Sequence, residues 1–373
     1  MKKAVCISCT QHYHERTKYI LNSLQEQGYE CVYLTSDFNH MKKERYTADA
    51  PDAMQIPTRA YKKNISLARI LSHMKFARDA IRLAAKMQPD LLYVEIPPNS
   101  LCREAAKFKR KHRDVKLIFD IFDLWPETFP SGRAKKLLAP MFSLWAAFRD
   151  RHLGAADFVT TECDLFRDML ELPEDTSATV HLCAEPLSIP AIAPDLREDR
   201  LELCYLGAIN NVIDIPSICT LIRELTKHKP VVLHIIGKGE RQQEFIDAAK
   251  AAGADVEFYG PVYDDGEKQA IMARCHFGLN MMKSSVCVGL TMKSVDYFRF
   301  GLPIINNIPA DTRELVLQRN VGYQIGEGCS EKILSSTVAD CIKMRICAEA
   351  VFSDTFHKDK VLAQYGRILE NVI

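Results

Sequence analysis

Four residues near the start of one segment have the types and spacing needed to bind a phosphate. Gly289-Leu290-Thr291 precedes a run with large apolar residues at three- and four-residue spacings, which predicts a helix capped by Thr291. A helix N-terminus offers unpaired N–H groups and the positive end of a dipole. Lys293 adds a charge in the first turn, and Asp296 follows on the same side. The alternative is a capped amphipathic helix with solvated charges.

Two further junctions in the second half end in glycines with polar neighbours. Gly207 and Asn210 follow a predicted strand, and Lys238 and Gly239 follow the next one. A tight glycine turn places Lys238 over a phosphate at a strand-to-helix junction. A dinucleotide fingerprint would need a third glycine, which is absent here. An exposed lysine in a simple turn remains the other interpretation.

The first half has two candidate polar clusters, each directly after a predicted strand. His12, His14 and Arg16 follow the first strand, and Asp123 and Glu127 belong to an Asp-Leu-Trp-Pro-Glu turn. Ligands of open α/β sheets bind at the carboxyl ends of the strands. A carboxylate there can orient or deprotonate a hydroxyl. Ordinary turn and cap chemistry explains the same residues equally well.

These residues depend on an alternation of strands and helices, which predicts α/β domains with parallel sheets. A chain of 373 residues is long for one core, so two domains are expected. We expect an N-terminal domain over 1–190, a second over 200–345, and a helical end over 346–373. The proline-rich segment 185–200 is expected to link them. Strands are predicted at 4–7, 31–34, 91–95, 116–120, 158–161 and 180–183, and then at 201–206, 231–236, 256–259, 277–280 and 304–305.

Composition excludes several classes of protein. A net charge of +1 argues against a general nucleic-acid binder. Thirteen scattered cysteines and the lack of a signal peptide indicate reduced thiols in the cytoplasm. Cys6 and Cys9 have redox-motif spacing but lie at a strand end, which favours a structural pair. No apolar run reaches the ~18 residues of a membrane helix, and no His or Cys spacing indicates a metal site.

One basic segment raises the question of membrane association. Residues 132–151 interleave lysine and arginine with apolar residues that include Trp145 and Phe148. A basic helix with an aromatic face can lie on an anionic membrane. A core helix with a solvated basic side has the same pattern.

Taken together, the chain resembles GT-B glycosyltransferases of the retaining family four type, which build bacterial capsules and other surface polysaccharides. The matching stretches lie in both halves at the family's spacing. They are 119–127, Tyr205-Leu206-Gly207, Ile236 to Glu240, 256–260, Thr291 to Tyr297, and Gly301-Leu302-Pro303. The resemblance implies two Rossmann-like domains facing a cleft, with the C-terminal helix crossing back to the first domain.

The resemblance also implies roles for these residues. The second domain would hold a nucleotide-diphosphate sugar on Gly207, Asn210, Lys238, Gly239, Gly289, Leu290, Thr291, Lys293 and Asp296, with Asp296 on the ribose hydroxyls. The first domain would bind the acceptor through His12, His14, Arg16 and Glu127. Catalysis would use Asp123, Lys238 and Lys293, with no metal and no cofactor.

Three positions depart from the family pattern. Val288 stands where an acidic residue is common, and Phe122 where histidine is common. The loop after Gly207 has no arginine or lysine. At Val288 a contact to the donor sugar is therefore missing or supplied elsewhere, and His12 or His14 is the candidate to replace the missing histidine in the cleft.

The sequence therefore favours a hexosyltransferase that uses a UDP-sugar and a glycan or lipid-linked acceptor. It would be cytoplasmic, or peripheral at the inner membrane face, without nucleic acid as a partner. A GT-B epimerase or hydrolase of the nucleotide sugar is the enzymatic alternative. A non-catalytic partner of another transferase is a third interpretation, and an NAD dehydrogenase a distant fourth.

Overall fold

The chain forms two compact units in the computed structural model. One unit comprises Met1–His181 with Val361–Ile373, and the other comprises Leu182–Lys360. The structure describes residues 1–10, 14–48, 53–129 and 137–372, with only the backbone of residues 14 and 15. The predicted linker over 185–200 falls in the second unit and has almost no regular structure.

The first unit is built on a seven-stranded sheet in which every pair of neighbours is parallel. The strand order is β5-β2-β1-β6-β7-β8-β9, and β1 pairs with β2 and β6. β1 is fully apolar and buried from Ala4 to Ile7, as expected of a central parallel strand. The strands are β1 (Lys3–Ser8), β2 (Glu30–Ser36), β5 (Ala53–Ile56), β6 (Leu91–Ile96), β7 (Lys116–Ile121), β8 (Phe158–Thr161) and β9 (Ser177–Thr179), and a small hairpin adds β3 (Phe38–Asn39) and β4 (Glu44–Arg45).

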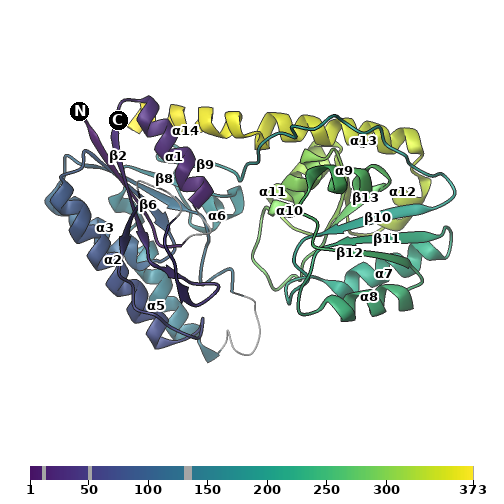
Figure 1. Cartoon of the computed structure of the whole chain (residues 1–373), viewed down its shortest axis with the longest axis horizontal. Helices are drawn as coiled ribbons and strands as arrows, with labels where there is room; N and C mark the ends of the chain where they lie inside the picture. The colour runs from purple at the N-terminus through teal and green to yellow at the C-terminus, as the bar shows by residue number, and fades with distance from the viewer. Residues whose placement is uncertain (11–13, 49–52, 130–136, 373) are drawn as a thin grey trace. The chain divides into compact units, whose positions relative to one another are not determined.

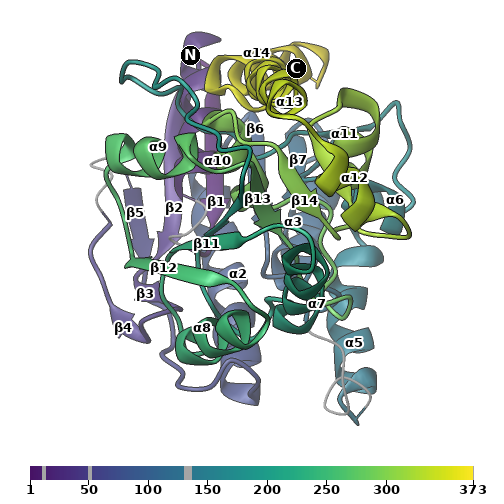
Figure 2. The ribbon, with the colours of Figure 1, turned by 90° about the vertical axis from the view of Figure 1, so that its right-hand side faces the viewer.

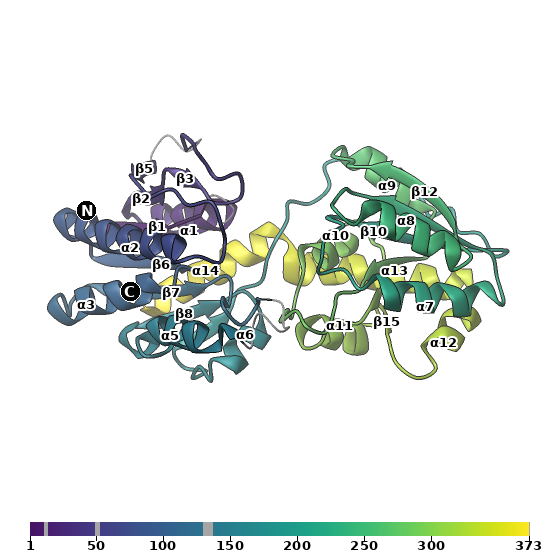
Figure 3. The same ribbon diagram turned by 90° about the horizontal axis from the view of Figure 1, so that it is seen from below.

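Helices cover both faces of this first sheet. Figures 1 and 3 show α2, α3 and α5 together on one face, with α1 and the end of α14 on the other. α2 begins where Ser66 accepts a hydrogen bond from the Arg69 amide, a standard N-cap. The helices are α1 (His14–Glu26), α2 (Leu67–Met87), α3 (Ser100–Lys111), α5 (Ala139–Asp150), a 3₁₀ turn (Leu153–Ala155), α6 (Asp164–Met169) and α14 (Lys358–Val372).

The second unit repeats this plan with a parallel six-stranded sheet. The order is β12-β11-β10-β13-β14-β15. The sequence order reverses direction between β10 and β13, which makes a topological switch point where ligands of such sheets bind. The strands are β10 (Leu201–Leu206), β11 (Val231–Ile236), β12 (Asp255–Gly260), β13 (Phe277–Asn280), β14 (Ile304–Asn306) and β15 (Gly322–Gln324).

Helices again lie on both faces of the second sheet. Figures 1 and 2 show α7 and α8 on one face and α9, α10 and α13 on the other. The buried side of α7 packs with β10 and β11 in one apolar core. The helices are α7 (Ile215–Thr226), α8 (Gln242–Ala251), α9 (Asp265–Ala273), α10 (Met292–Arg299), α11 (Asp311–Arg319), α12 (Cys329–Ser335) and α13 (Val338–Val351), followed by a π-helical turn (Phe352–Phe356).

The expected α/β class with two parallel sheets is confirmed, while some elements differ from the prediction. The strand predicted at 180–183 is wrong, because the last strand of the first sheet is the more polar β9. Val180 only extends that pairing, through its amide hydrogen bond to Thr161 (2.8 Å). The short α11 and β15 were not predicted, since neither has a strong apolar period. None of the described helices is long and apolar enough to span a membrane.

Candidate functional site

The loops after β10 and β11 pack against each other at the carboxyl edge of the second sheet. The Gly207 amide donates a hydrogen bond to the Ile236 carbonyl (2.8 Å), and the Ile209 amide donates one to the Lys238 carbonyl (3.0 Å). A Cβ added to Gly237, whose φ is 149°, would lie 1.9 Å from the Gly207 carbonyl oxygen. The two loops therefore approach so closely that a side chain would block their contact.

The helix predicted to bind a phosphate is present as α10. Thr291 caps it by accepting from the Ser294 amide (3.2 Å), and the Thr291 amide donates to the Ser294 hydroxyl (3.3 Å). This capping box corrects one expectation, because the Thr291 N–H is already bonded within the protein. No described residue accepts from the amides of Leu290, Met292 or Lys293, so these remain the groups that can bind an anion.

Lys293 lies in the first turn of α10 and extends to the loop after β10. Its Nζ donates to the Tyr205 hydroxyl (2.5 Å) and lies 4.1 Å from the centre of that ring. Its Cε lies 3.1 Å from the place where a Cβ on Gly207 would be. The structure thus brings together Gly207 and Lys293, which were predicted to share a site.

The charge on Lys293 has no acidic partner. Among the described residues no carboxylate lies within 4.0 Å of its Nζ, and burial lowers the pKa of the amine to about 7. Removing a cation partly from water without a counter-ion costs free energy. An anionic ligand beside the amine and the free N–H groups of α10 would remove that cost and restore the positive charge.

Asp296 lies one turn after Lys293 on α10. Burial is the main reason why its pKa rises to about 6, and the neighbouring Asp265 adds to the effect. Arg299 pairs with Asp265 (2.7 Å) and not with Asp296. The Asp296 carboxylate has no hydrogen bond from any described residue, so it is available to a ligand's hydroxyl groups.

The remaining predicted donor residues lie in the two glycine loops. Lys238 is exposed, and Gly239 packs so tightly that a Cβ there would lie 2.1 Å from the Ile209 carbonyl oxygen. The Asn210 side chain accepts from the Val212 amide (3.1 Å), which shapes its own loop. Gly289 is buried, and its carbonyl accepts from the Thr312 hydroxyl (2.7 Å). This contact fixes the backbone just before α10.

In the first unit, the Asp-Leu-Trp-Pro-Glu turn follows β7 as expected. Asp123 accepts from the Thr128 hydroxyl (2.7 Å), and burial is the largest cause of its raised pKa. Glu127 accepts two hydrogen bonds from Arg149 (2.8 and 3.0 Å). The Glu127 carboxylate therefore holds the turn to α5, while Asp123 is the carboxylate with fewer partners.

The three predicted residues after β1 have different outcomes. Arg16 is buried and pairs with Asp120 through two nitrogens (2.7 and 2.8 Å), while its third nitrogen donates to the Val180 carbonyl (2.8 Å). These bonds engage all of its nitrogens and favour a structural role over an acceptor contact. His12 lies outside the described residues, as does the side chain of His14.

Trp145, one of the two aromatic residues considered for membrane contact, lies in the core. Trp145 is 3% exposed, and its ring contacts those of Trp125 and Phe148. The exposed apolar residues of this segment are instead Leu137 and Leu144, at 82% and 62%. For Trp145 the burial supports the core interpretation over the membrane one, and residues 132–136 of the basic segment lie outside the described residues.

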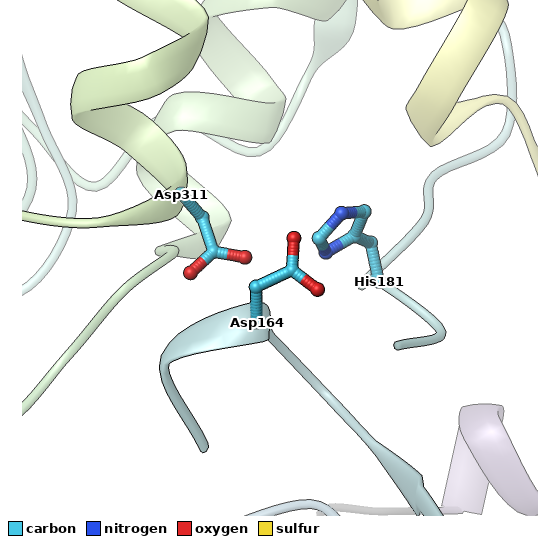
Figure 4. Close-up of side chains that lie close together, drawn as sticks. All are labelled: Asp164, His181 and Asp311. Atoms are coloured by element: carbon cyan, nitrogen blue, oxygen red, sulfur yellow. The ribbon is translucent and has the colours of Figure 1, made fainter. Parts of the chain in front are cut away.

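Figure 4 shows Asp164 and His181, two side chains with metal-ligand chemistry in the first unit, together with Asp311 from α11 of the second unit. Asp164 accepts from the Thr179 hydroxyl and pairs with Arg167 (3.6 Å). The His181 ring lies 3.2 Å from the Glu162 carbonyl oxygen. Two side chains are fewer than the four ligands of a structural zinc site, so this pair by itself does not form one.

The sequence missed two contributors to these sites. The Tyr205 hydroxyl accepts a hydrogen bond from the Lys293 amine although 88 residues separate the two. Only the knowledge that β10 pairs with β13, the strand before α10, could have indicated this contact. Arg69 lies beside Trp125, with 5.1 Å between its Cζ and the ring centre. Its place near the N-terminus of α2 was the only signal that the sequence offered.

Comparisons with known proteins agree with this architecture. Residues 200–341 match the family model described as glycosyl transferases group 1, which covers most of the second unit. Among curated proteins, none matches the sequence.

Solved structures match over almost the whole chain. Sucrose-phosphate synthase from Thermosynechococcus elongatus has a TM-score of 0.69 at 12% identity, covering 99% of this chain and 98% of that one. Anabaena HepE in complex with UDP and glucose has a TM-score of 0.64 at 13% identity, covering 99% and 100%. The chain has the GT-B fold.

A third structure extends the comparison. The lipopolysaccharide outer core galactosyltransferase WaaB in its apo form has a TM-score of 0.65 at 14% identity, covering 100% of this chain and 99% of that one. The predicted resemblance to GT-B glycosyltransferases is thereby confirmed. Identities this low establish the fold and leave the reaction to be argued from the site.

Proposed function

We propose that this chain is a glycosyltransferase that takes a sugar from a nucleotide diphosphate and transfers it with retention to a glycan or lipid-linked acceptor. The observation that carries the proposal is Lys293, a half-buried amine at a helix N-terminus with no acidic partner in the described structure. The family match of the second unit supports a sugar transfer. UDP is the proposed nucleotide because HepE, of the same fold, was solved with UDP and with UDP-glucose.

The proposed chemistry is the stabilisation of a departing diphosphate. As the sugar–phosphate bond breaks, negative charge grows on the phosphate oxygens, and preorganised cations and N–H groups lower the barrier. Lys293 and the amides that begin α10 would supply this stabilisation, with Lys238 as a second cation. Asp296 would bind the ribose hydroxyls. In this scheme lysines and a helix N-terminus take the place of a metal ion.

The acceptor would be oriented in the first unit. Asp123 is the proposed residue that orients or deprotonates the acceptor hydroxyl, because it follows β7 at the carboxyl edge and keeps a raised pKa. Association with an anionic membrane surface, in surface polysaccharide synthesis, is also part of the proposal. Leu137 and Leu144 are exposed, and Arg103 lies near the same helix, 4.5 Å from the Phe148 ring.

The release of UDP tests this function directly. The protein would be incubated with a panel of UDP-sugars and with a lipid extract from its own source membrane, and free UDP would be measured. We expect release from one donor, a loss of at least about 100-fold in Lys293→Met, and little change in Lys250→Met. Lys250 is exposed on α8 and makes a matched control. An NMR spectrum of the product would show whether the anomeric configuration is retained.

A non-catalytic nucleotide-binding partner is the second candidate, and one observation favours it. The loop from Gly207 to Asp214 contributes no cation, and Asn211 in this loop is paired with Glu240. Binding of UDP without release of any sugar would support this candidate. Release or inversion of the sugar without an acceptor would instead indicate the hydrolase or epimerase alternative.

A further inference from the structure

Two cations converge on one asparagine at the carboxyl edge of the first sheet. Arg69, near the start of α2, donates to the Asn64 backbone carbonyl (3.0 Å). Lys43, in the turn between β3 and β4, donates to the Asn64 side-chain oxygen. Like charges repel, so an anion bound close to both residues would lower the electrostatic energy of the pair.

In the described structure neither cation of this pair forms a salt bridge. No carboxylate of a described residue lies within 4.0 Å of Lys43 or Arg69. Arg69 Nε is buried and donates to nothing, which leaves a strong donor unsatisfied. Burial and the charge of Arg69 both lower the pKa of Lys43. Burial is the main reason why the pKa of His73 lies well below its usual value, and the charges of Arg69 and Lys43 lower it further.

The walls of this site are aromatic and carry further unused donors. The Tyr61 ring lies 4.8 Å from Lys43 Nζ, and the Trp125 ring lies 5.1 Å from Arg69 Cζ. Trp145 Nε1 and the Tyr61 hydroxyl are both buried without a hydrogen-bond partner. A small hollow beside Arg69 is lined by Asn64, Ser66, His73, Trp125 and Trp145, among others. The hollow therefore offers donors and no acidic side chain.

Trp125, which lines the hollow, lies two residues after Asp123. The charge of Arg69 acts on the Asp123 carboxylate and opposes the rise of its pKa that burial causes. Asp123 follows the carboxyl end of β7, and Arg69 lies in the first turn of α2, the helix that comes after β5; ligands of α/β sheets bind at the carboxyl edge. A group held by Arg69 would thus be placed beside the residue proposed to orient the acceptor hydroxyl.

We infer that Arg69 and Lys43 form a subsite for an anionic group of the acceptor, either a phosphate or a sugar carboxylate. Guanidinium binds both groups in a bidentate manner, and lysine adds a point charge. The inference rests on the proposed function, since it names the chemical class of the acceptor. It predicts that the substrate which receives the sugar is negatively charged close to the reacting hydroxyl.

The test is a calorimetric titration of the full chain with inorganic phosphate while UDP saturates the second unit. We expect binding that weakens at least about tenfold in Arg69→Gln and in Lys43→Gln, because each removes a charge-assisted contact. Arg78→Gln is the matched control, since Arg78 is exposed on the same helix. Equal phosphate affinity in Arg69→Gln and Arg78→Gln would overturn the inference.

Two further ligands separate the sources of the anion. Glucose 1-phosphate carries a phosphate ester and glucuronate carries a carboxylate, while glucose carries neither. The subsite is supported if either anion binds and if its affinity falls in Arg69→Gln but not in Arg78→Gln. The anion that binds then identifies the source as a phosphate ester or a carboxylate. Glucose binding as tightly as both anions would contradict it.

Failure of this inference can be distinguished from failure of the proposed function. If UDP binds but phosphate shows no dependence on Arg69, the donor site stands and the anionic subsite is wrong. If UDP does not bind, the phosphate titration is repeated in Lys293→Met, which removes the second unit's own anion site. An Arg69-dependent signal there keeps the subsite as an anion site while refuting the donor assignment, and the lack of such a signal overturns the subsite.

Discussion

The affinity of the protein for UDP is expected to fall as the pH rises above 7, because Lys293 must gain a proton when the ligand binds. Burial lowers the pKa of Lys293 to about 7 in the free protein. At higher pH the free amine is therefore mostly neutral. A bound diphosphate favours the ammonium form and raises that pKa again. Proton uptake and binding are thus linked, and the sign requires weaker binding at higher pH.

The magnitude follows from the two pKa values. With a free pKa of about 7 and an ordinary lysine pKa of ~10.4 in the complex, the dissociation constant rises by up to about 70-fold between pH ~7.5 and ~9.5. The terminal phosphate of UDP stays ionised over this range, because the second pKa of a phosphate is about 6. Near pH ~8.5 the binding of one UDP should take up about one proton.

The assay is calorimetry in two buffers with different ionisation enthalpies, which measures proton uptake directly. Lys293→Met should bind UDP at least about tenfold more weakly near neutral pH and take up no proton. Lys250→Met, which changes an exposed lysine on α8, should behave like the wild type. Wild-type binding with no proton uptake and no pH dependence would refute the role of Lys293.

Three shorter predictions concern packing. Gly237→Ala should lower the free energy of unfolding by roughly 2–4 kcal/mol, because the new Cβ would meet the Gly207 carbonyl at an unfavourable φ. Gly366→Ala is the control: the space around Gly366 is open, so this change should raise the free energy of unfolding by about 0.5–1 kcal/mol. Urea unfolding measures both. Arg16→Met should lower the free energy of unfolding by about 3–5 kcal/mol, because it leaves the Asp120 carboxylate buried without its cationic partner. An unchanged urea midpoint would contradict this. Trp145→Ser should destabilise the fold by about 3–5 kcal/mol, while Leu144→Ser should change the stability by no more than about 0.5 kcal/mol. Leu144→Ser should instead reduce binding to anionic vesicles. A stable Trp145→Ser variant that no longer binds vesicles would place Trp145 outside the core.

Local sequence signals predicted the parts of the donor site that depend on local structure. Thr291 and Lys293 could be placed at a helix N-terminus because capping and apolar spacing act within a few residues. The glycines after β10 and β11 were identified for the same reason. The tight contact between their loops, however, depends on which strands are neighbours, and the sequence does not state strand order directly.

Partners that lie far apart in the sequence account for what could not be predicted. Arg16 was expected to contact an acceptor, but its partner Asp120 is 104 residues away. The pattern of the α5 segment fitted both a core helix and a membrane-facing one, and only the packing of Trp145 against Trp125 decides between them. Lys43 lies in the turn between β3 and β4 and Arg69 lies 26 residues later in α2, so nothing local indicated that they meet at Asn64.

The measurement that tests the central claim most directly is thermal unfolding of the protein against a panel of nucleotide diphosphates and nucleotide sugars. A ligand at about one hundred times its dissociation constant stabilises a fold by ~2.7 kcal/mol. The account predicts selective stabilisation by one nucleotide diphosphate, lost in Lys293→Met and kept in Lys250→Met. If no nucleotide in the panel stabilises the protein, or if the effect persists in Lys293→Met, the donor site proposed for the second unit is contradicted.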